Sequence, residues 1–454
     1  MYRIKSFFNT HKILLTSIIA IALPAIGEMS LNTLLGVADT LMISHFIGPN
    51  ALSAVGYANQ IVFTLIFIFS SFNTGATAMI SRTYGEKNYK KLNIIAAQST
   101  SINLIIGIIV TILAFLFARQ IIGIYDVSED VFRMALEYFY IIVLGMLFMF
   151  LSFSCAAILR GSGNTITPMV ITGIANVMNI IGNYILITGF GPFPEMGIAG
   201  AAWSTTISRM IAIILYTNIL FIKKNRVRIK IKYMKITKNI LKPLWNLSYP
   251  GAIEQALMQI SFVIVGIIVS KLDTNSEAAF RILLNIESIS FMPAVGLSIA
   301  AATLVGKTLG ENDTEKASAT GYTAAIIGVL WGIFMGGIFF VFPKQLLGVF
   351  TPEKKIILLS LTTMYFIGLN QPFLNYMIVI SGALRGAGDT RSVMAIVFLR
   401  LWSMFVPLTY LFIIVLDKGV VGVWYAEIMS FLVFSIVISL RFKSKKWTEI
   451  RIDS

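Results

Sequence analysis

The heptapeptide LRGSGNT at residues 159–165 recurs as LRGAGDT at residues 384–390, 225 positions later. Three further pairs match at offsets of 222 to 226: YGEKN at 84–88 with LGEND at 309–313, Pro24 and Glu28 with Pro250 and Glu254, and GIAG at 197–200 with GVVG at 419–422. Matches at nearly one spacing indicate an internal duplication, so the fold of one repeat predicts the fold of the whole chain.

The composition indicates an integral membrane protein. Of 454 residues, 57% are hydrophobic and only 13% are charged, and the mean hydropathy is +0.83. Such a chain has too little polar surface to coat a soluble globule. Because a membrane-crossing helix needs about 20 apolar residues, we predict twelve spans, at residues 13–44, 51–80, 92–118, 132–158, 165–188, 197–222, 240–270, 276–305, 317–342, 356–384, 391–416 and 419–442.

The duplication divides these spans into two halves of six. We therefore predict an all-α polytopic protein with an N-terminal lobe at residues 1–222, a basic cytoplasmic linker at 223–239 and a C-terminal lobe at 240–454. An even number of helices per repeat gives both lobes the same orientation, related by a pseudo-twofold axis along the membrane normal. Secondary transporters with parallel repeats hold their cargo in a cleft between the two halves.

The formal net charge of +15 is distributed unevenly along the chain. Lys and Arg gather in the segments that are cytoplasmic when the N-terminus is inside, so both termini are predicted to be cytoplasmic, in a prokaryotic inner membrane. Residues 223–232 alternate basic and apolar side chains. This pattern favours contact with anionic lipid head groups over binding of nucleic acid.

The sequence lacks the motifs of several catalytic and energy-coupling sites. The single cysteine, Cys155, and two histidines, His11 and His45, cannot build a His/Cys metal cage. Residues 301–308 lack the first glycine of a phosphate-binding loop, and residues 386–391 end in Arg where a dinucleotide loop needs Gly. We therefore expect no enzyme activity and no bound cofactor. Energy would come from an ion gradient, unless the protein is a facilitator or a channel.

Ionisable residues within the spans are candidate functional groups, because a charge costs at least about 2.5–3.5 kcal/mol at mid-bilayer. Asp39, three helical turns after Glu28, is the candidate for reversible protonation, with a structural acid as the alternative. Glu28 and Glu254 each follow a proline by four residues and are either structural hydrogen-bond anchors or ion or cargo sites. The other charged candidates are Glu287, which could pair with Arg281 or with water near the outer face, and Glu427, which could pair with Arg400 or Arg209.

Two further features of the spans have a structural and a functional interpretation. Pro24 interrupts the hydrogen-bond ladder of the first span, which makes it either a hinge or a static bend. Asn176, Asn179 and Asn183 recur about once per turn of the fifth span and so share one face. Their amides could coordinate a cation or join two helices.

The chain resembles the multidrug and toxic compound extrusion (MATE) transporters over essentially its whole length. The resemblance rests on Pro24 followed by VADTLMIS at 37–44, on Gly75-Ala76 with Tyr84-Gly85, on the two LRGxGxT loops, and on GIAGAAW at 197–203. It implies two six-helix bundles and an antiporter that exports bulky, often cationic compounds in exchange for protons or sodium ions. A lipid-linked oligosaccharide flippase of the same superfamily is the alternative, and an ion channel is a more distant one.

The resemblance also implies the ion-coupling residues. The family's first-helix acid corresponds to Asp39, and its helper positions correspond to Asn179, Asn183 and Thr205, which would also be the ligands of a sodium ion. Some members carry Asp where this chain has Asn183. Because residues 360–388 contain no Asp or Glu, a C-terminal sodium site is not supported, and the pattern resembles DinF-like rather than NorM-like members. The expected partners are small organic molecules and the lipid bilayer, with the protein acting as a monomer.

Overall fold

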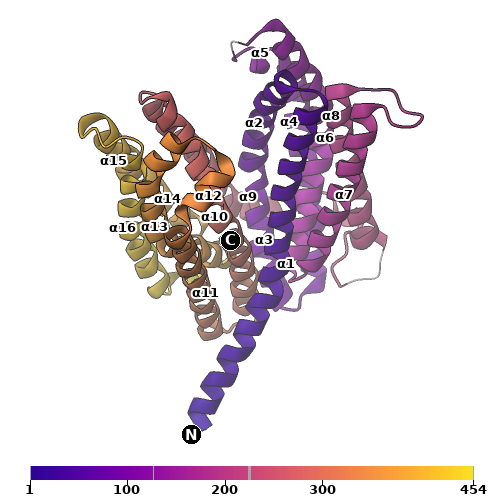
Figure 1. Ribbon diagram of the computed structural model, residues 1–454. Helices are drawn as coiled ribbons and strands as arrows, with labels where there is room; N and C mark the ends of the chain where they lie inside the picture. The colour runs from indigo at the N-terminus through magenta and orange to yellow at the C-terminus, as the bar shows by residue number, and fades with distance from the viewer. Residues whose placement is uncertain (1, 126, 223–225, 453–454) are drawn as a thin grey trace. The chain divides into compact units, whose positions relative to one another are not determined.

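The computed structural model describes residues 2–125, 127–222 and 226–452, and these residues form helices and no strand (Figure 1). The first half comprises α1 (Tyr2–Phe46), α2 (Pro49–Ser70), α3 (Phe72–Gly85), α4 (Tyr89–Leu116), α5 (Ala118–Ile122), α6 (Glu129–Gly161), α7 (Ile166–Thr188), α8 (Gly197–Thr217), η1 (Asn218–Ile222) and η2 (Ile231–Tyr233). The second comprises α9 (Lys238–Val269), α10 (Thr274–Gly310), α11 (Thr314–Val341), α12 (Pro343–Phe350), α13 (Lys354–Ala387), α14 (Thr390–Leu399), η3 (Arg400–Phe405), α15 (Val406–Tyr410), η4 (Leu411–Val415), α16 (Val421–Lys443) and η5 (Lys446–Glu449).

Twelve stretches of the described residues are long and apolar enough to cross a membrane, in the predicted order, which confirms the fold class. Two of them are less regular than predicted. The second is divided into α2 and α3 at Ser71, whose hydroxyl donates to the carbonyl of Ile68 and so competes with the backbone ladder. The eleventh contains two π-helical segments, η3 and η4, on either side of Pro407, which has no N–H to donate.

Contacts divide the described chain into two compact units, residues 27–248 (the first unit) and residues 2–26 with 249–452 (the second unit). The units differ from the predicted lobes at both ends of the first one. Ile18 and Ala22 of α1 are buried in a core cluster otherwise formed by residues after 264. Ser248 of α9 donates to the carbonyl of Phe72 at 2.8 Å and so packs within the first unit. Packing partners, not span order, set these boundaries.

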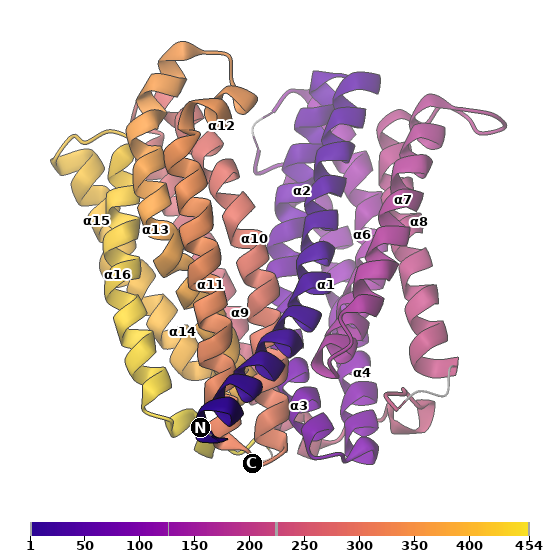
Figure 2. The ribbon, with the colours of Figure 1, turned by 60° about the horizontal axis from the view of Figure 1, so that its bottom comes forward.

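Each unit is built around one long, largely buried helix. In the first unit α6 contacts α2, α3, α4 and α8, and α8 contacts α7. In the second unit α13 contacts α10, α11, α14 and α16, and both ribbon views show it among these helices (Figure 1 and Figure 2). α6 is the fourth membrane-spanning helix of the first repeat, and α13 is the fourth of the second repeat. Corresponding helices of the two repeats therefore take the same central place in their units.

The duplication extends to the backbone of the turns. Lys87 and Asn312, 225 residues apart, both adopt a left-handed conformation, with φ of 56° and 61°. The next residues, Asn88 and Asp313, cap α4 and α11: each side chain accepts a hydrogen bond from the backbone N–H three residues later, at 3.1 and 2.9 Å. Side-chain capping of this kind satisfies an N–H that the helix itself leaves unpaired.

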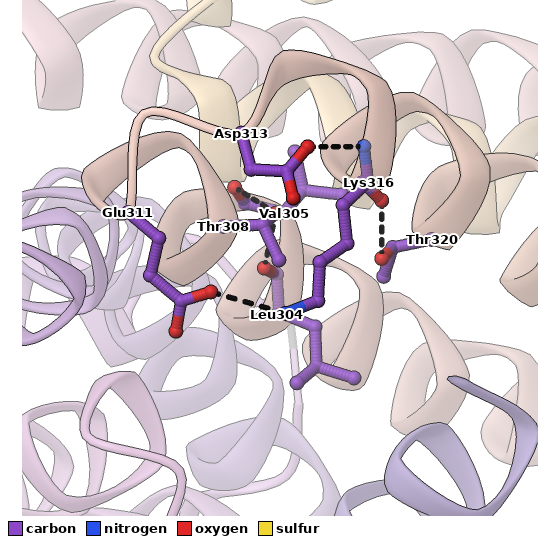
Figure 3. Close-up of polar contacts among 7 residues, drawn as sticks. All are labelled: Leu304, Val305, Thr308, Glu311, Asp313, Lys316 and Thr320. Carbon is purple, nitrogen blue, oxygen red and sulfur yellow. Dashed lines mark hydrogen bonds and ion pairs between the residues drawn. The ribbon is translucent and has the colours of Figure 1, made fainter. Parts of the chain in front are cut away.

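Figure 3 shows the turn between α10 and α11. The Lys316 ammonium lies 3.2 Å from the Glu311 carboxylate, which ties the two helix ends together. The hydroxyl of Thr308 donates to the carbonyl of Leu304, and that of Thr320 donates to the carbonyl of Lys316. Together with the Asp313 cap, these bonds satisfy the polar groups of a turn that must leave and re-enter the apolar phase.

The predicted linker is only partly described, because residues 223–225 lie outside the described residues. From residue 226 onward it packs on α4. Asn93 accepts from the backbone N–H of Arg228 at 2.8 Å, and Gln98 accepts from that of Thr237 at 3.0 Å. Lys230 and Lys232 remain exposed. Contact of these lysines with anionic lipid stays a prediction.

Close helix packing in the second unit depends on glycine. A Cβ added to Gly386 of α13 would lie 2.1 Å from the carbonyl oxygen of Ala302 on α10, whereas one added to Gly337 of α11 would meet nothing within 4 Å. We therefore expect Gly386→Ala to lower the free energy of unfolding by about 1–3 kcal/mol through overpacking. Gly337→Ala should be neutral or stabilising by up to about 1 kcal/mol. Unfolding of both variants in detergent micelles measures the difference, and equal stabilities would contradict the assigned contact.

Candidate functional site

The second half of α1 packs against α7 within the first unit. A Cβ on Gly27 would lie 2.9 Å from the sulfur of Met169, and the amide of Asn176 donates to the carbonyl of Leu31 at 2.8 Å. Positions 169, 176 and 183 are two turns apart and therefore share one face of α7. The first of the three predicted asparagines, Asn176, thus joins two helices.

The structure brings Asp39, Asn179, Asn183 and Thr205 together from α1, α7 and α8. The Asn183 amide donates to Asp39 Oδ1 at 2.6 Å and lies 3.3 Å from the Asn179 amide. The Asn179 amide lies 3.0 Å from Thr205 Oγ1. A chain of polar contacts thus runs from the carboxyl of Asp39 to the hydroxyl of Thr205. Asn179 and Asn183 are almost completely buried.

The neighbours of Asn179 are satisfied when its amide nitrogen faces Asp39. In that orientation the nitrogen donates to Asp39 Oδ1 at 2.8 Å, and the amide oxygen accepts from the Thr205 hydroxyl at 3.0 Å and from the Thr205 backbone N–H at 3.1 Å. The opposite orientation would place the amide oxygen against the carboxylate oxygen, and neither of these can donate. Asn179 and Asn183 therefore both present amide donors to Asp39.

Small residues bring α7 and α8 close enough to form this group. Ser204 donates to the backbone carbonyl of Asn179 at 2.7 Å, and a Cβ on Gly182 would lie only 2.5 Å from the Ser204 hydroxyl. A Cβ on Gly200 would overlap the carbonyl of Leu186. Small residues at such crossings let helix backbones approach within a membrane and let hydroxyls bond across the interface.

Arg209, predicted as one possible partner of Glu427, belongs instead to the environment of Asp39. It follows Thr205 by one turn of α8, and its guanidinium is close enough to Asp39 for an electrostatic interaction. Its Nε is buried and has no hydrogen-bond partner in the described part of the chain. The i, i+4 spacing from Thr205 was the sequence signal that could have located it.

Glu28 and Glu254 form equivalent ion pairs in the two repeats. In the first unit, Nη1 of Arg160 lies 3.1 Å from each carboxylate oxygen of Glu28. In the second unit, Arg385 pairs with Glu254. Each pair joins the first helix of a repeat to the LRGxGxT end of its fourth helix. Each acid is thus paired with an arginine of its own unit. This pairing favours a structural role for Glu28 and Glu254.

Of the two predicted partners of Glu287, Arg281 and water, the structure contradicts Arg281. Arg281 pairs instead with Glu277 at 2.8 Å on the exposed side of α10. Six residues are about 600° of helical rotation, so positions 281 and 287 lie on different faces. Glu287 is buried, and its carboxylate accepts from Gln371 and from the indole of Trp424.

Comparison with known proteins identifies the family. One family model, MatE, matches the chain twice, at residues 24–185 and at residues 250–411. The chain belongs to the MatE family. Both limits of the second match lie 226 residues after those of the first, which confirms that this MatE chain is an internal duplication.

Relatives and solved structures match the MatE chain over nearly its whole length. It is 32% identical to "Probable multidrug resistance protein NorM" of Thermotoga maritima, covering 95% of this chain and 92% of the relative. It is 28% identical to "Uncharacterized transporter YisQ" of Bacillus subtilis, covering 95% of each. A crystal structure of "MATE in the bent conformation" superimposes with a TM-score of 0.89 at 21% identity, covering 96% of this chain and 98% of that one, which shows that the two share a fold.

Proposed function

We propose that this MatE chain is a secondary active multidrug antiporter that exports bulky, often cationic compounds in exchange for protons. The observation that carries the proposal is the carboxyl of Asp39, held within a span by Asn183 at 2.6 Å and approached by Arg209. Relatives named as multidrug resistance proteins support the class of cargo. Lipid-linked oligosaccharide flipping is not favoured, because none of the relatives named above has a name that refers to it.

The amides around Asp39 respond to its protonation. The Asn179 nitrogen can donate to the ionised carboxyl at 2.8 Å, and the Asn183 amide donates to it at 2.6 Å. Hydrogen bonds to an ionised acceptor are stronger than those to a neutral one, so protonation of Asp39 would weaken both bonds and loosen the contact of α1 with α7.

Sodium is the alternative coupling ion. Its ligands would be oxygen atoms of Asp39, Asn179, Asn183 and Thr205, and Asn183 Oδ1 is buried without a partner in the described residues. The nearby guanidinium of Arg209 opposes this, because two fixed positive charges repel strongly in a low-dielectric interior. One acid beside one arginine suits a proton. We propose a DinF-like type of coupling for this reason, although the relative from Thermotoga maritima is named NorM.

In the proposed cycle, cargo and proton compete through Asp39. Protonation removes the charge of the carboxylate and weakens the charge-assisted hydrogen bond from Asn183. The second half of α1 then rearranges about Pro24, which lies two residues before the boundary between the two contact units. We propose that the protein acts as a monomer in a prokaryotic inner membrane, with both termini cytoplasmic and no cofactor besides the coupling ion.

Transport by the purified protein in liposomes tests this function. We expect a pH gradient alone to drive ethidium against its concentration gradient, and a sodium gradient alone to drive none. Proton flux should accompany ethidium in a fixed ratio, because an antiporter couples the two. Failure of the pH gradient to drive ethidium, or movement of either species without the other, as in a channel, would reject the proposal.

A further inference from the structure

A groove lies among three helices of the second unit. Its volume of about 450 Å³ falls within the roughly 300–1,000 Å³ of small-molecule sites. Its described lining residues come from α11, α13 and α16. α13 contacts both of the other helices and lies between them (Figure 2). The groove therefore belongs to one unit, and the proposed function does not use it.

The hydroxyl groups in the groove are bonded within the protein. The Tyr376 hydroxyl of α13 lies 2.7 Å from that of Ser439 on α16, and Ser439 donates in turn to the carbonyl of Ser435. The Ser435 hydroxyl donates to the carbonyl of Phe373 at 3.3 Å. Since these polar groups already have partners, and the side chains around them are mostly apolar, this part of the groove suits a hydrocarbon chain.

The groove is open along α16. Ile436 and Leu440, one turn apart on that helix, line it and are 56% and 62% exposed. The helices α11, α13 and α16 all belong to stretches long and apolar enough to cross a membrane. The acyl chains of the bilayer surround such stretches, so a chain can enter the groove from the side.

Positive charge gathers at one end of the groove. Lys443, the last residue of α16, is the charged side chain among the described residues that line it. Lys445 and Lys446 follow, and all three lysines are exposed and form no ion pair with another described residue. Arg441 differs, because it is paired with Asp389 at 2.7 Å. Three uncompensated cations therefore stand beside an apolar groove.

Aromatic packing holds this basic end in place. The Phe442 ring meets that of Tyr322 on α11 edge to face at 4.9 Å, and it stacks on Trp447 at 4.8 Å. Trp447 is fully buried, and its indole donates to the carbonyl of Phe442 at 2.8 Å. Lys445 adopts a left-handed conformation, with φ of 54°, where the chain leaves α16. The lysines are thus positioned before any ligand arrives, which lowers the cost of binding.

We propose that this groove binds an anionic phospholipid, with one acyl chain against α13 and the phosphate beside Lys443, Lys445 and Lys446. An apolar groove with cations at one end is complementary to a molecule that has an apolar tail and an anionic head. A lysine stem can lie on apolar surface while its ammonium reaches a phosphate, and basic residues at the cytoplasmic ends of spans attract anionic lipids. With the C-terminus cytoplasmic, as proposed above, the lipid comes from the inner leaflet.

Native mass spectrometry of the full-length protein, released from micelles that contain added lipid, tests this binding. We expect one molecule of phosphatidylglycerol to bind more than about tenfold tighter than phosphatidylcholine with the same acyl chains. Because a lysine near an anionic lipid contributes about fivefold, Lys443→Gln should weaken binding about fivefold. Adding Lys445→Gln and Lys446→Gln should weaken it about a hundredfold. Equal binding of the two lipids would overturn the proposal.

Matched variants test the position of the site. The charge control replaces three exposed lysines at the starts of α12 and α13, Lys344, Lys354 and Lys355, with glutamine, and it should bind phosphatidylglycerol normally. Val329→Trp fills the groove and should abolish tight binding, whereas Leu330→Trp, at a 60% exposed neighbour outside the lining, should retain it. Equal loss in both lysine triples, or normal binding by Val329→Trp, would overturn the site.

Two further outcomes distinguish other occupants. Glycerol 3-phosphate should not displace phosphatidylglycerol, because it has the anionic head without the apolar tail, and displacement would show a phosphate site instead. The unmodified protein should elute as a monomer in size-exclusion chromatography. A dimer that Val329→Trp separates would show that a second copy of the chain covers the groove, and would overturn the lipid site. If Val329→Trp fails to fold, the exposed lysine variants still decide the proposal.

Discussion

Replacing Asp39 with asparagine is expected to reduce gradient-driven ethidium movement to the level of protein-free liposomes. Asparagine keeps the size of the side chain, and its oxygen can still accept from Asn183, which lies 2.6 Å from Asp39 Oδ1. It cannot bind and release a proton near neutral pH, so the step that couples the gradient to cargo is lost while the packing of α1 on α7 is retained.

Three measurements make this prediction specific. Circular dichroism and size-exclusion elution should match those of the unmodified protein. Ethidium binding in micelles should lose its dependence on pH and stay at the weaker level that the unmodified protein shows when Asp39 is protonated. The matched control is Asp130→Asn at the exposed start of α6, which should transport normally. Full gradient-driven transport by Asp39→Asn would reject the mechanism.

Removal of Arg385 is expected to lower the free energy of unfolding by about 3–5 kcal/mol, because it leaves the charge of Glu254 buried and unpaired. The Glu254 side chain is only 4% exposed. Arg160→Met should have a similar effect in the other repeat, since its partner Glu28 is 6% exposed. Unfolding of Arg385→Met and Arg160→Met in micelles measures these costs.

Two controls separate the lost ion pair from lost packing. Arg281→Met removes one partner of an ion pair whose side chains are 75% and 39% exposed, and it should cost less than about 1 kcal/mol. Adding Glu254→Gln to Arg385→Met should recover much of the stability, because the unpaired charge disappears. If Arg385→Met and Arg281→Met were equally stable, the two buried pairs would not anchor the repeats.

The spans and the duplication were predictable because they depend on local composition and spacing. The second match of the family model confirms the repeat, and the order of the twelve spans holds throughout. The break at Ser71 and the π-helical η3 were not predictable, since both arise from hydrogen bonds and packing that hydropathy does not record. The first part of α1 packs with the second repeat for a similar reason: Ile18 and Ala22 are apolar enough for either unit, and only contacts decide between them.

The contact partners of the ionisable residues were likewise only partly predictable from the sequence. Asn179, Asn183 and Thr205 could be grouped with Asp39 because the family resemblance supplied the alignment, and helical spacing placed two of them on one face. The pairing of Glu287 with Arg281 was wrong because closeness in sequence is not closeness on a helix. The bond between Glu287 and Trp424 joins residues 137 positions apart.

By itself, the sequence determined that this chain crosses a membrane twelve times in two repeats, because the cost of burying polar groups in lipid dictates span length and charge placement. The sequence also identified the few ionisable side chains that lie within the membrane spans. The tertiary structure alone decided what each charge meets: Arg160 for Glu28, Asn183 for Asp39, and neutral donors for Glu287. A charge inside a membrane protein persists only beside a partner, and helix packing brings that partner from a distant part of the chain.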